Sequence, residues 1–213
     1  MKAIDQAAIE TLGIPRMLLM DHAGLALAKA AITLQPPKPD LSLIFCGSGG
    51  NGGDGLSAAR HLHAQGGSVR IVLACAASRL SGEPAVFHRI VQSLGIPVLE
   101  CSLSSANTLA AWLQECSLII DALLGMGLAG GLREPFRTLI EKINASGKPV
   151  ICADVPSGLD GDTGSPLDLA VRSQLTVSFG LAKQGCLTPE GRTYAGNLIV
   201  DSITLPPQLL SGD

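Results

Sequence analysis

Short runs of mostly apolar residues alternate along this chain with segments in which apolar residues recur every three or four positions. Continuous apolar runs are typical of strands buried on both faces, and the longer spacing is typical of amphipathic helices. The pattern predicts helices at 84–94 and 132–143. The predicted strands are 41–46, 69–73, 97–99, 117–121, 150–154, 175–179 and 197–200.

Two helices are predicted before the first strand. Apolar residues of 1–12 fall on one helical face and polar residues on the other. The segment Gly13-Ile14-Pro15 ends that helix, because glycine and proline both interrupt helical hydrogen bonding. A second, apolar helix is predicted at 16–32, followed by a proline-rich loop at 34–39.

The alternation of strands and helices predicts repeated βαβ units with right-handed crossovers. The fold class is therefore α/β: a three-layer αβα sandwich with a Rossmann-like, doubly wound, mostly parallel sheet. Because no linker-like segment divides the chain, we expect a single domain over residues 1–213. In such sheets, ligands bind at the carboxyl ends of the strands.

Composition excludes several classes of protein. Of the 213 residues, 46% are hydrophobic and 15% charged, which excludes extensive disorder. The net charge of −3 and 3% aromatic content argue against a nucleic-acid partner. No uninterrupted apolar run approaches the roughly 18 residues of a membrane span, so no membrane association is expected. Six cysteines without a CxxC pair predict reduced thiols in a cytoplasmic protein.

A glycine-rich segment follows the first predicted strand. Residues 47–55 contain six glycines in nine positions and lead directly into a helix. Bare backbone N–H groups at a helix start can bind phosphate, although a tight turn without a ligand remains the alternative. The spacing Gly47-x-Gly49-x-x-Gly52 matches a dinucleotide motif, but no acid occurs between Asp54 and Glu83 to bind the ribose.

Polar residues also follow three later strands. Asp121 precedes a second glycine-rich loop, Asp154 precedes Ser157, and Lys183 follows the sixth strand. In a parallel sheet these groups and Asn51 converge at one edge, where a carboxyl group can act as a general acid and oxygen ligands suit a hard cation. The alternatives are turn or capping roles for the aspartates and a surface position for Lys183.

These motifs, in their order, resemble the YjeF amino-terminal domain family, the NAD(P)H-hydrate epimerases. The resemblance extends over nearly the whole chain. The segments that carry it are 3–5, 13–15, 19–24, 47–56, 121–128, 154–160 and 176–180, with Lys183.

The resemblance implies an isomerase that interconverts the R and S epimers of hydrated NADH and NADPH. It further implies a homodimer, one K⁺ per subunit, and a separate NAD(P)H-hydrate dehydratase as functional partner. Asp154 would be the general acid and base, assisted by Lys183. The implied K⁺ ligands are Asn51, Asp121 and Ser157. The implied substrate contacts are Gly50, Asn51, Gly52, Gly53, Asp54, Gly125, Met126, Gly127, Leu128, Ala129, Gly130, Gly131 and Asp154.

One position departs from the family pattern. Gly50 stands where the family usually has asparagine, which removes a side-chain amide from the glycine-rich segment. A non-catalytic nucleotide-binding or dimerisation scaffold is therefore the first alternative. A conventional NAD-dependent oxidoreductase is the second, disfavoured by the missing ribose-binding acid.

Overall fold

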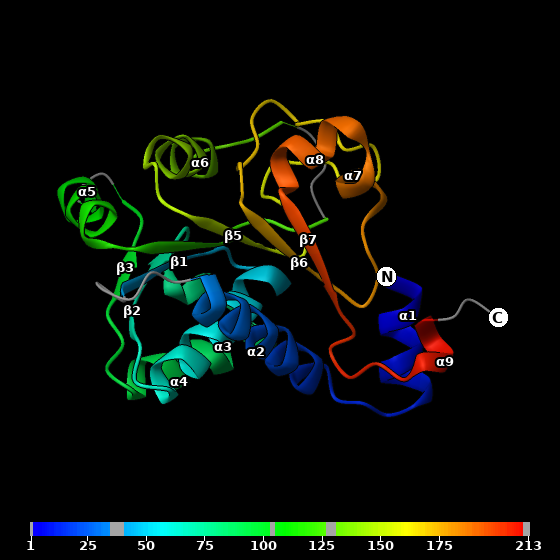
Figure 1. Ribbon diagram of the computed structural model, residues 1–213. Helices are drawn as coiled ribbons and strands as arrows, with labels where there is room; N and C mark the ends of the chain where they lie inside the picture. Colours follow the sequence, from blue (N-terminus) through cyan, green and yellow to red (C-terminus); the bar gives the residue numbers. More distant parts are fainter. Residues whose placement is uncertain (1, 35–40, 103–104, 127–130, 211–213) are drawn as a thin grey trace.

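The computed structural model describes residues 2–34, 41–102, 105–126 and 131–210. Most of the proline-rich loop predicted at 34–39 lies outside these residues. The described part of the chain forms helices on both faces of one central sheet (Figure 1).

The sheet has seven strands in the order β3-β2-β1-β4-β5-β6-β7, and every neighbouring pair is parallel. The predicted α/β fold with a doubly wound, parallel sheet is confirmed. The strands are β1 (Leu41–Cys46), β2 (Ser68–Leu73), β3 (Val98–Glu100), β4 (Leu118–Ala122), β5 (Val150–Ala153), β6 (Leu175–Phe179) and β7 (Asn197–Asp201).

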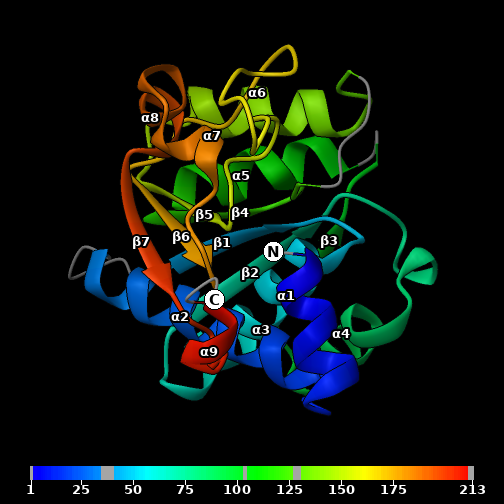
Figure 2. The ribbon, with the colours of Figure 1, turned by 90° about the vertical axis from the view of Figure 1, so that its right-hand side faces the viewer.

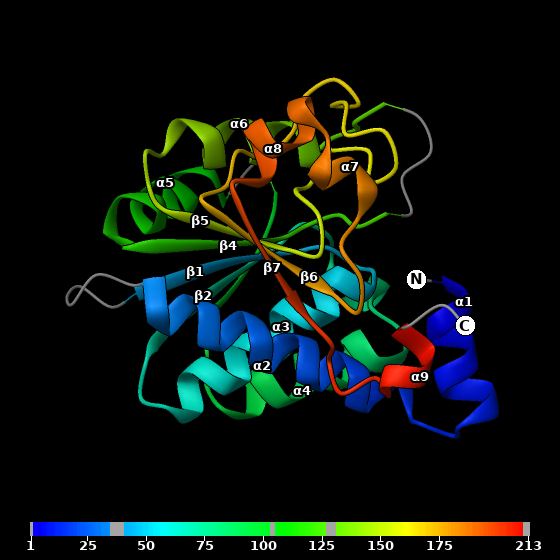
Figure 3. The same cartoon turned by 45° about the vertical axis from the view of Figure 1, so that its right-hand side comes forward.

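Helices cover the two faces of the sheet in separate layers, so the predicted αβα sandwich is confirmed. One face carries α2 (Arg16–Leu34), α3 (Gly50–Ala64) and α4 (Gly82–Ser93) (Figures 1 and 3). The other carries α5 (Ala106–Glu115), α6 (Phe136–Ala145), α7 (Gln184–Leu187) and α8 (Pro189–Ala195). Each layer buries a separate apolar cluster against the sheet, because inward side chains alternate between the faces along each strand.

The amino-terminal helix differs from the single helix predicted. It begins as α1 (Lys2–Gln6) and continues as a π-helical turn, η1 (Ala7–Thr11). Gly13, with φ of +69°, then turns the chain toward α2. Figure 2 shows α1 beside α9 (Pro207–Leu210), so both ends of the chain lie near the same edge of the sheet.

Helix α2 bears on the expectation that no segment spans a membrane. An 18-residue window of this helix has a mean hydropathy of 1.4, so by length and composition alone it could cross a membrane, as the buried core helix of a globular protein also could. Asp21 and Lys29 interrupt the apolar run, but the mean hydropathy stays within the range of membrane-spanning helices. Half of the helix is buried inside the protein, where it packs against α3 and the sheet.

A close crossing joins α2 to α3. A Cβ atom on Gly24 would lie 2.7 Å from the backbone nitrogen of Ala58 and still closer to the Ser57 side chain. Beside this crossing, Asp21 accepts hydrogen bonds from Ser57 Oγ (2.8 Å) and Arg60 Nη2 (2.6 Å). The missing side chain at Gly24 therefore sets the position of α3, and with it the start of the glycine-rich segment.

We predict that Gly24→Ala lowers the free energy of unfolding by about 1–3 kcal/mol, because the added methyl group overpacks the crossing. Gly50→Ala is the matched control: a Cβ there meets nothing within 4 Å. Alanine stabilises a helix by up to about 1 kcal/mol over glycine, so this variant should be as stable as the wild type or more so. Denaturant unfolding measures both, and equal stability of the two variants would contradict the close crossing.

Candidate active site

The chain winds outward across the sheet in two opposite directions, one starting at β1 and the other at its neighbour β4. From β1 the chain passes through α3 toward β2, and from β4 it passes through α6 toward β5. The carboxyl ends of these strands therefore face a crevice between diverging connections, where doubly wound proteins bind ligands. The glycine-rich segment follows β1 at this crevice, and the second glycine-rich loop follows β4.

Packing explains most of the glycines that follow β1. A Cβ on Gly52 would overlap the carbonyl of Gly47, and one on Gly55 would lie 2.7 Å from Ala122 Cβ. Gly47 and Gly53 are equally constrained, by the Leu123 carbonyl and the Met20 side chain. None of these glycines adopts a positive φ. The number of glycines is therefore not by itself a sign of a ligand, contrary to our sequence argument.

Only Gly49 and Gly50 in this segment face open space, with nothing within 4 Å of an added Cβ. Gly50 is the first residue of α3, so its N–H group is one of those that an α-helix leaves without an internal partner. Phosphate binding at this end of α3 remains a prediction, now based on two glycines rather than six.

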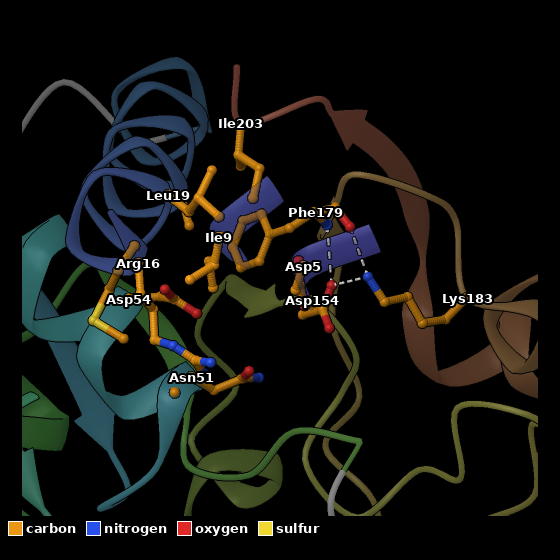
Figure 4. A pocket seen from close by; sticks show the side chains of 13 residues that line it. Asp5, Ile9, Arg16, Leu19, Asn51, Asp54, Asp154, Phe179, Lys183 and Ile203 are labelled. Carbon is orange, nitrogen blue, oxygen red and sulfur yellow. Dashed lines mark hydrogen bonds and ion pairs between the residues drawn. The ribbon is translucent and has the colours of Figure 1, made fainter. Parts of the chain in front are cut away.

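Two cavities adjoin at Gly50 and Asn51. The first, which we call the acid cavity, has a volume of about 200 Å³ and contains the aspartates and lysine of the site (Figure 4). The second, which we call the glycine-loop cavity, has about 450 Å³ and runs between the two glycine-rich loops toward Met126 and Phe136. The acid cavity is lined by Asp5, Ile9, Arg16, Leu19, Met20, Ala23, Gly50, Asn51, Asp54, Asp154, Phe179, Lys183 and Ile203.

Asp154 follows β5 and projects into the acid cavity from a tight turn. Its φ is +65°, and the Val155 N–H group donates across it to the Ala153 carbonyl (2.7 Å). Aspartate is among the few residues other than glycine that tolerate this backbone conformation. Such strained positions cluster at functional sites, because the surrounding structure must enforce them.

Lys183 is buried against Asp154, which excludes the alternative of a surface lysine. Only 2% of its side chain is exposed, and its ammonium group forms an ion pair with the Asp154 carboxylate. The same ammonium donates to the carbonyls of Phe179 (2.8 Å) and Leu181 (3.2 Å), and the Phe179 N–H group donates to Asp154 (3.0 Å). Both charges are thus compensated, as buried ion pairs require.

Asp54 faces the acid cavity from α3, opposite Asp154 (Figure 4). The residue is 8% exposed. Within the described part of the chain, its carboxyl group has neither a hydrogen bond nor an ion pair. Burial raises the pKa of Asp54 well above its usual value, and the charges of Asp154 and Asp5 raise it further, against a smaller opposing effect of Lys183.

Asn51 joins the ends of two strands. Its amide nitrogen donates to the carbonyls of Leu124 (3.1 Å) and Ala153 (2.8 Å), which follow or end β4 and β5. Gly125 must be glycine for this contact, because a Cβ there would lie 2.7 Å from Asn51 Oδ1. Asn51 therefore fixes the first glycine-rich segment relative to the second.

Asp121 lies within β4, one residue before its end, and its carboxylate is fully buried. It accepts hydrogen bonds from Ser157 Oγ (2.6 Å), the Ser157 N–H group (2.8 Å), Leu123 N–H (3.2 Å) and the Cys152 thiol (3.2 Å). Burial raises the pKa of Asp121, and the hydrogen bonds from Ser157 act in the opposite direction.

The chemistry of these groups fits a monovalent cation. Asn51 and Ser157 both donate to the Leu124 carbonyl, and Ser157 Oγ lies 2.6 Å from the Asp121 carboxylate. They offer one carboxylate and several neutral oxygens, and Asp121 has no cationic side chain beside it among the described residues. No group of three or more His, Cys, Asp or Glu side chains suited to a metal occurs in the described ranges, so a multi-carboxylate site is not formed there.

The second glycine-rich loop is described only at its ends. Gly125 contacts Asn51, Met126 lines the glycine-loop cavity, and an added Cβ on Gly131 would lie 3.1 Å from Asp168. The predicted substrate contacts Gly127, Leu128, Ala129 and Gly130 lie outside the described residues. Asp121 and Ser157 do not line the acid cavity but lie behind Asn51, whereas Asp154 and Lys183 line it.

Sequence reasoning missed several walls of the acid cavity. Asp5 and Ile9 reach it from α1 and η1, and Arg16 from the start of α2. Phe179 and Ile203 enclose it from β6 and the segment after β7. Helical spacing assigned the amino-terminal residues to a helix face, but nothing in that pattern indicated that the helix would pack across the sheet edge.

The fold and site define a Rossmann-like α/β protein whose acidic cavity adjoins a glycine-lined crevice. Residues 17–185 match the family model described as YjeF-related protein N-terminus. Because this match spans most of the chain, the chain belongs to that family.

Relatives and a solved structure agree with this assignment. The chain is 38% identical to the NAD(P)H-hydrate epimerase of Limosilactobacillus fermentum, over 94% of this chain and 92% of that protein. It is 42% identical to the bifunctional NAD(P)H-hydrate repair enzyme Nnr of Pyrobaculum aerophilum, over 93% of this chain but only 40% of that protein. The crystal structure of yeast ynu0 shares the fold, with a TM-score of 0.77 and 24% identity over 87% of this chain and 80% of its own.

We predict that Asp54→Asn raises the free energy of unfolding at pH 7. A carboxyl group whose pKa is raised on folding destabilises the folded state as pH rises from about 4 toward that raised value. The difference from wild type should therefore be small near pH 3 and exceed about 1 kcal/mol at neutral pH, since one pKa unit is worth about 1.4 kcal/mol.

Asp21→Asn is the matched comparison and should have the opposite sign. Burial alone would raise the pKa of Asp21, but hydrogen bonds from Arg60 and Ser57 hold it below its usual value. This variant should lose stability at neutral pH and approach the wild type as pH falls below the usual range of aspartate. Denaturant unfolding between pH 3 and 8 measures both. A loss of stability in Asp54→Asn at pH 7 would show that Asp54 has a stabilising partner.

Proposed function

We propose that this protein is an NAD(P)H-hydrate epimerase, an isomerase that interconverts the R and S epimers of hydrated NADH and NADPH. The observation that carries the proposal is the position of the Asp154–Lys183 ion pair, in a cavity that adjoins the open start of α3 at Gly50. The name of the Limosilactobacillus relative, which the chain covers almost completely, supports the same activity. The chain spans about 40% of the length of the bifunctional relatives.

The two cavities suit the two ends of the substrate. A hydrated nicotinamide ring is small and carries one hydroxyl group, which matches the smaller acid cavity with its aspartates. The rest of the dinucleotide is larger and anionic, and extends through the glycine-loop cavity past Gly49, Gly50 and Gly125. Exposed N–H groups at the start of α3 bind the pyrophosphate there.

The reaction requires proton transfer at a hydroxyl group beside a ring nitrogen. When that hydroxyl leaves as water, the nitrogen lone pair forms a planar iminium ion. Water that adds to the opposite face then gives the other epimer. Asp154 exchanges the proton with this oxygen, and Lys183 holds the carboxylate in place through the contacts with Phe179 and Leu181.

A K⁺ ion held by Asn51, Asp121 and Ser157 would add positive charge behind the cavity and offset the buried Asp121 carboxylate. Asn51 belongs to both the proposed K⁺ site and the substrate site, because it contacts the Leu124 carbonyl and lines both cavities. Its amide therefore couples the cation to the position of the glycine-rich segment.

Two partners complete the proposal. An NAD(P)H-hydrate dehydratase would be the functional partner that consumes one epimer in the cytoplasm, since the bifunctional relatives are named as NAD(P)H-hydrate repair enzymes. A second copy of this chain would form a homodimer. Ile199 and Val200, each 48% accessible, lie on the edge strand β7, which is therefore one candidate place for the contact.

The activity is tested with a single purified epimer of hydrated NADPH. We expect the protein to equilibrate the two epimers far faster than the uncatalysed reaction, followed by chromatography. Asp154→Asn should reduce the rate by about 10²–10⁴, the usual contribution of a positioned proton-transfer group. Asparagine also tolerates the backbone conformation at this position, so the turn should persist.

Two controls separate catalysis from folding. Glu115→Gln neutralises an exposed carboxylate paired with Arg70 at the opposite edge of the sheet, and it should retain full activity. Asp154→Asn combined with Lys183→Met removes both charges, leaves no unpaired ion, and should fold without activity. Wild-type protein that binds the dinucleotide without accelerating epimer exchange would support the scaffold alternative instead.

The cation is tested separately by thermal unfolding. Replacing Na⁺ with K⁺ at constant ionic strength should raise the Tm, by about 2–4 °C for each kcal/mol of binding free energy in a protein of this size. Asp121→Asn should abolish this difference, and Glu115→Gln should keep it. Equal Tm values of the wild type in both salts would argue against a bound K⁺.

A further inference from the structure

Asp54 is a buried carboxyl group that the reaction described so far does not use. It lines the acid cavity, is 8% exposed, and has no hydrogen bond or ion pair among the residues that the structure describes. Asp154 differs in both respects, because Lys183 and the Phe179 N–H group compensate its charge. The cavity therefore holds two carboxyl groups in unlike environments.

The two groups also lie on opposite walls. Asp54 projects from the first turns of α3 on one side, and Asp154 from the turn after β5 on the other, with Asn51 between them (Figure 4). Inversion at a ring carbon needs water to leave one face and to return on the other. A single carboxyl group on one wall reaches only one face of a ring fixed by its bound dinucleotide.

We propose that Asp54 and Asp154 act on opposite faces of the hydrated ring, Asp54 as the proton donor on one face and Asp154 as the proton acceptor on the other. This inference rests on the proposed epimerase activity and specifies how the same cavity performs it. Asp54 supplies the proton with which the hydroxyl leaves as water, and the carbon–oxygen bond breaks as the ring nitrogen forms the iminium ion.

In the second half of the reaction, water adds to the iminium ion and releases a proton. Water on the Asp154 face forms the new carbon–oxygen bond, and its proton passes to the Asp154 carboxylate. One proton has then moved from Asp54 to Asp154, while the substrate has changed only in configuration. The opposite epimer reacts in reverse from this state, or the protons redistribute through water after product leaves.

The environments of Asp54 and Asp154 favour the proposed roles of proton donor and proton acceptor. Burial and the neighbouring carboxylates raise the pKa of Asp54, which favours its protonated form and suits a proton donor. The ammonium group of Lys183 forms an ion pair with Asp154 and compensates its charge, which suits a proton acceptor. Pairs of carboxyl groups separated in this way serve as acid and base in other enzymes.

The test combines oxygen exchange with inversion in single-site variants. Each purified epimer, labelled with ¹⁸O at the ring hydroxyl, is incubated with wild type, Asp54→Asn or Asp154→Asn in unlabelled water. We expect Asp54→Asn to slow inversion more than 100-fold, while the epimer whose hydroxyl faces Asp154 still loses its label with retained configuration. Asp154→Asn should show the mirror pattern, with exchange confined to the other epimer.

Binding and folding are measured beside these rates. Asp54→Asn should bind NADPH within threefold of the wild-type Kd and, as predicted above, unfold at higher denaturant concentration. Asp21→Asn, which changes an aspartate away from the cavity on the α2–α3 crossing, should invert both epimers at the wild-type rate per folded molecule.

Three outcomes would overturn the inference while leaving the epimerase proposal intact. These are inversion by Asp54→Asn within tenfold of wild type, loss of exchange from both epimers in this variant, or the same exchange pattern in both variants. Failure of the wild type to accelerate inversion at all would instead contradict the proposed function.

Discussion

β1 and β4 are neighbours in a parallel sheet from which the chain winds away in opposite directions, and this arrangement positions every group of the site. The connections after the two strands diverge, so their carboxyl ends cannot be covered by the same helix. Asn51 spans the resulting crevice by donating to carbonyls at the ends of β4 and β5. The close crossing of α2 and α3 at Gly24 fixes the helix that carries Asn51 and Asp54.

The site contains several buried carboxyl groups, and the residues around them compensate their charges to different extents. Lys183 compensates Asp154, and four donors surround Asp121, but Asp54 has no partner in the described part of the chain. A structure selected only for stability would replace Asp54 with a neutral residue, since an unpaired buried carboxyl group is costly. Its presence opposite Asp154 is consistent with a loss of stability that is retained because the carboxyl group serves in proton transfer.

The sequence predicted the fold well where the hydrophobic pattern was continuous. β1 and β6 have the bounds expected from their mostly apolar runs, because nearly every position of both strands is buried. Helix α6 begins at Phe136 rather than 132, after a segment of bends and turns. The short helices α7 and α9 were not predicted, since four residues carry too little periodicity to detect.

The site was predicted in its position more than in its details. The rule for parallel sheets placed Asn51, Asp121, Asp154 and Lys183 at one edge, and the structure brings them there. It could not show that Lys183 is buried or that Asp121 lies behind the cavity, because burial depends on segments distant in sequence. The glycines misled for the same reason: contacts with Met20, Ala122 and Leu123 explain what local sequence attributes to a ligand.

The central claim is that configuration inverts when water leaves one face of the ring and returns on the other. It is tested most directly by following configuration and oxygen together in the wild-type reaction, with one epimer labelled with ¹⁸O and mass spectrometry of both separated epimers. The account predicts that every molecule that has inverted at early times carries oxygen from the solvent. Inverted product that retains the label would contradict it, because inversion would then proceed with the carbon–oxygen bond intact.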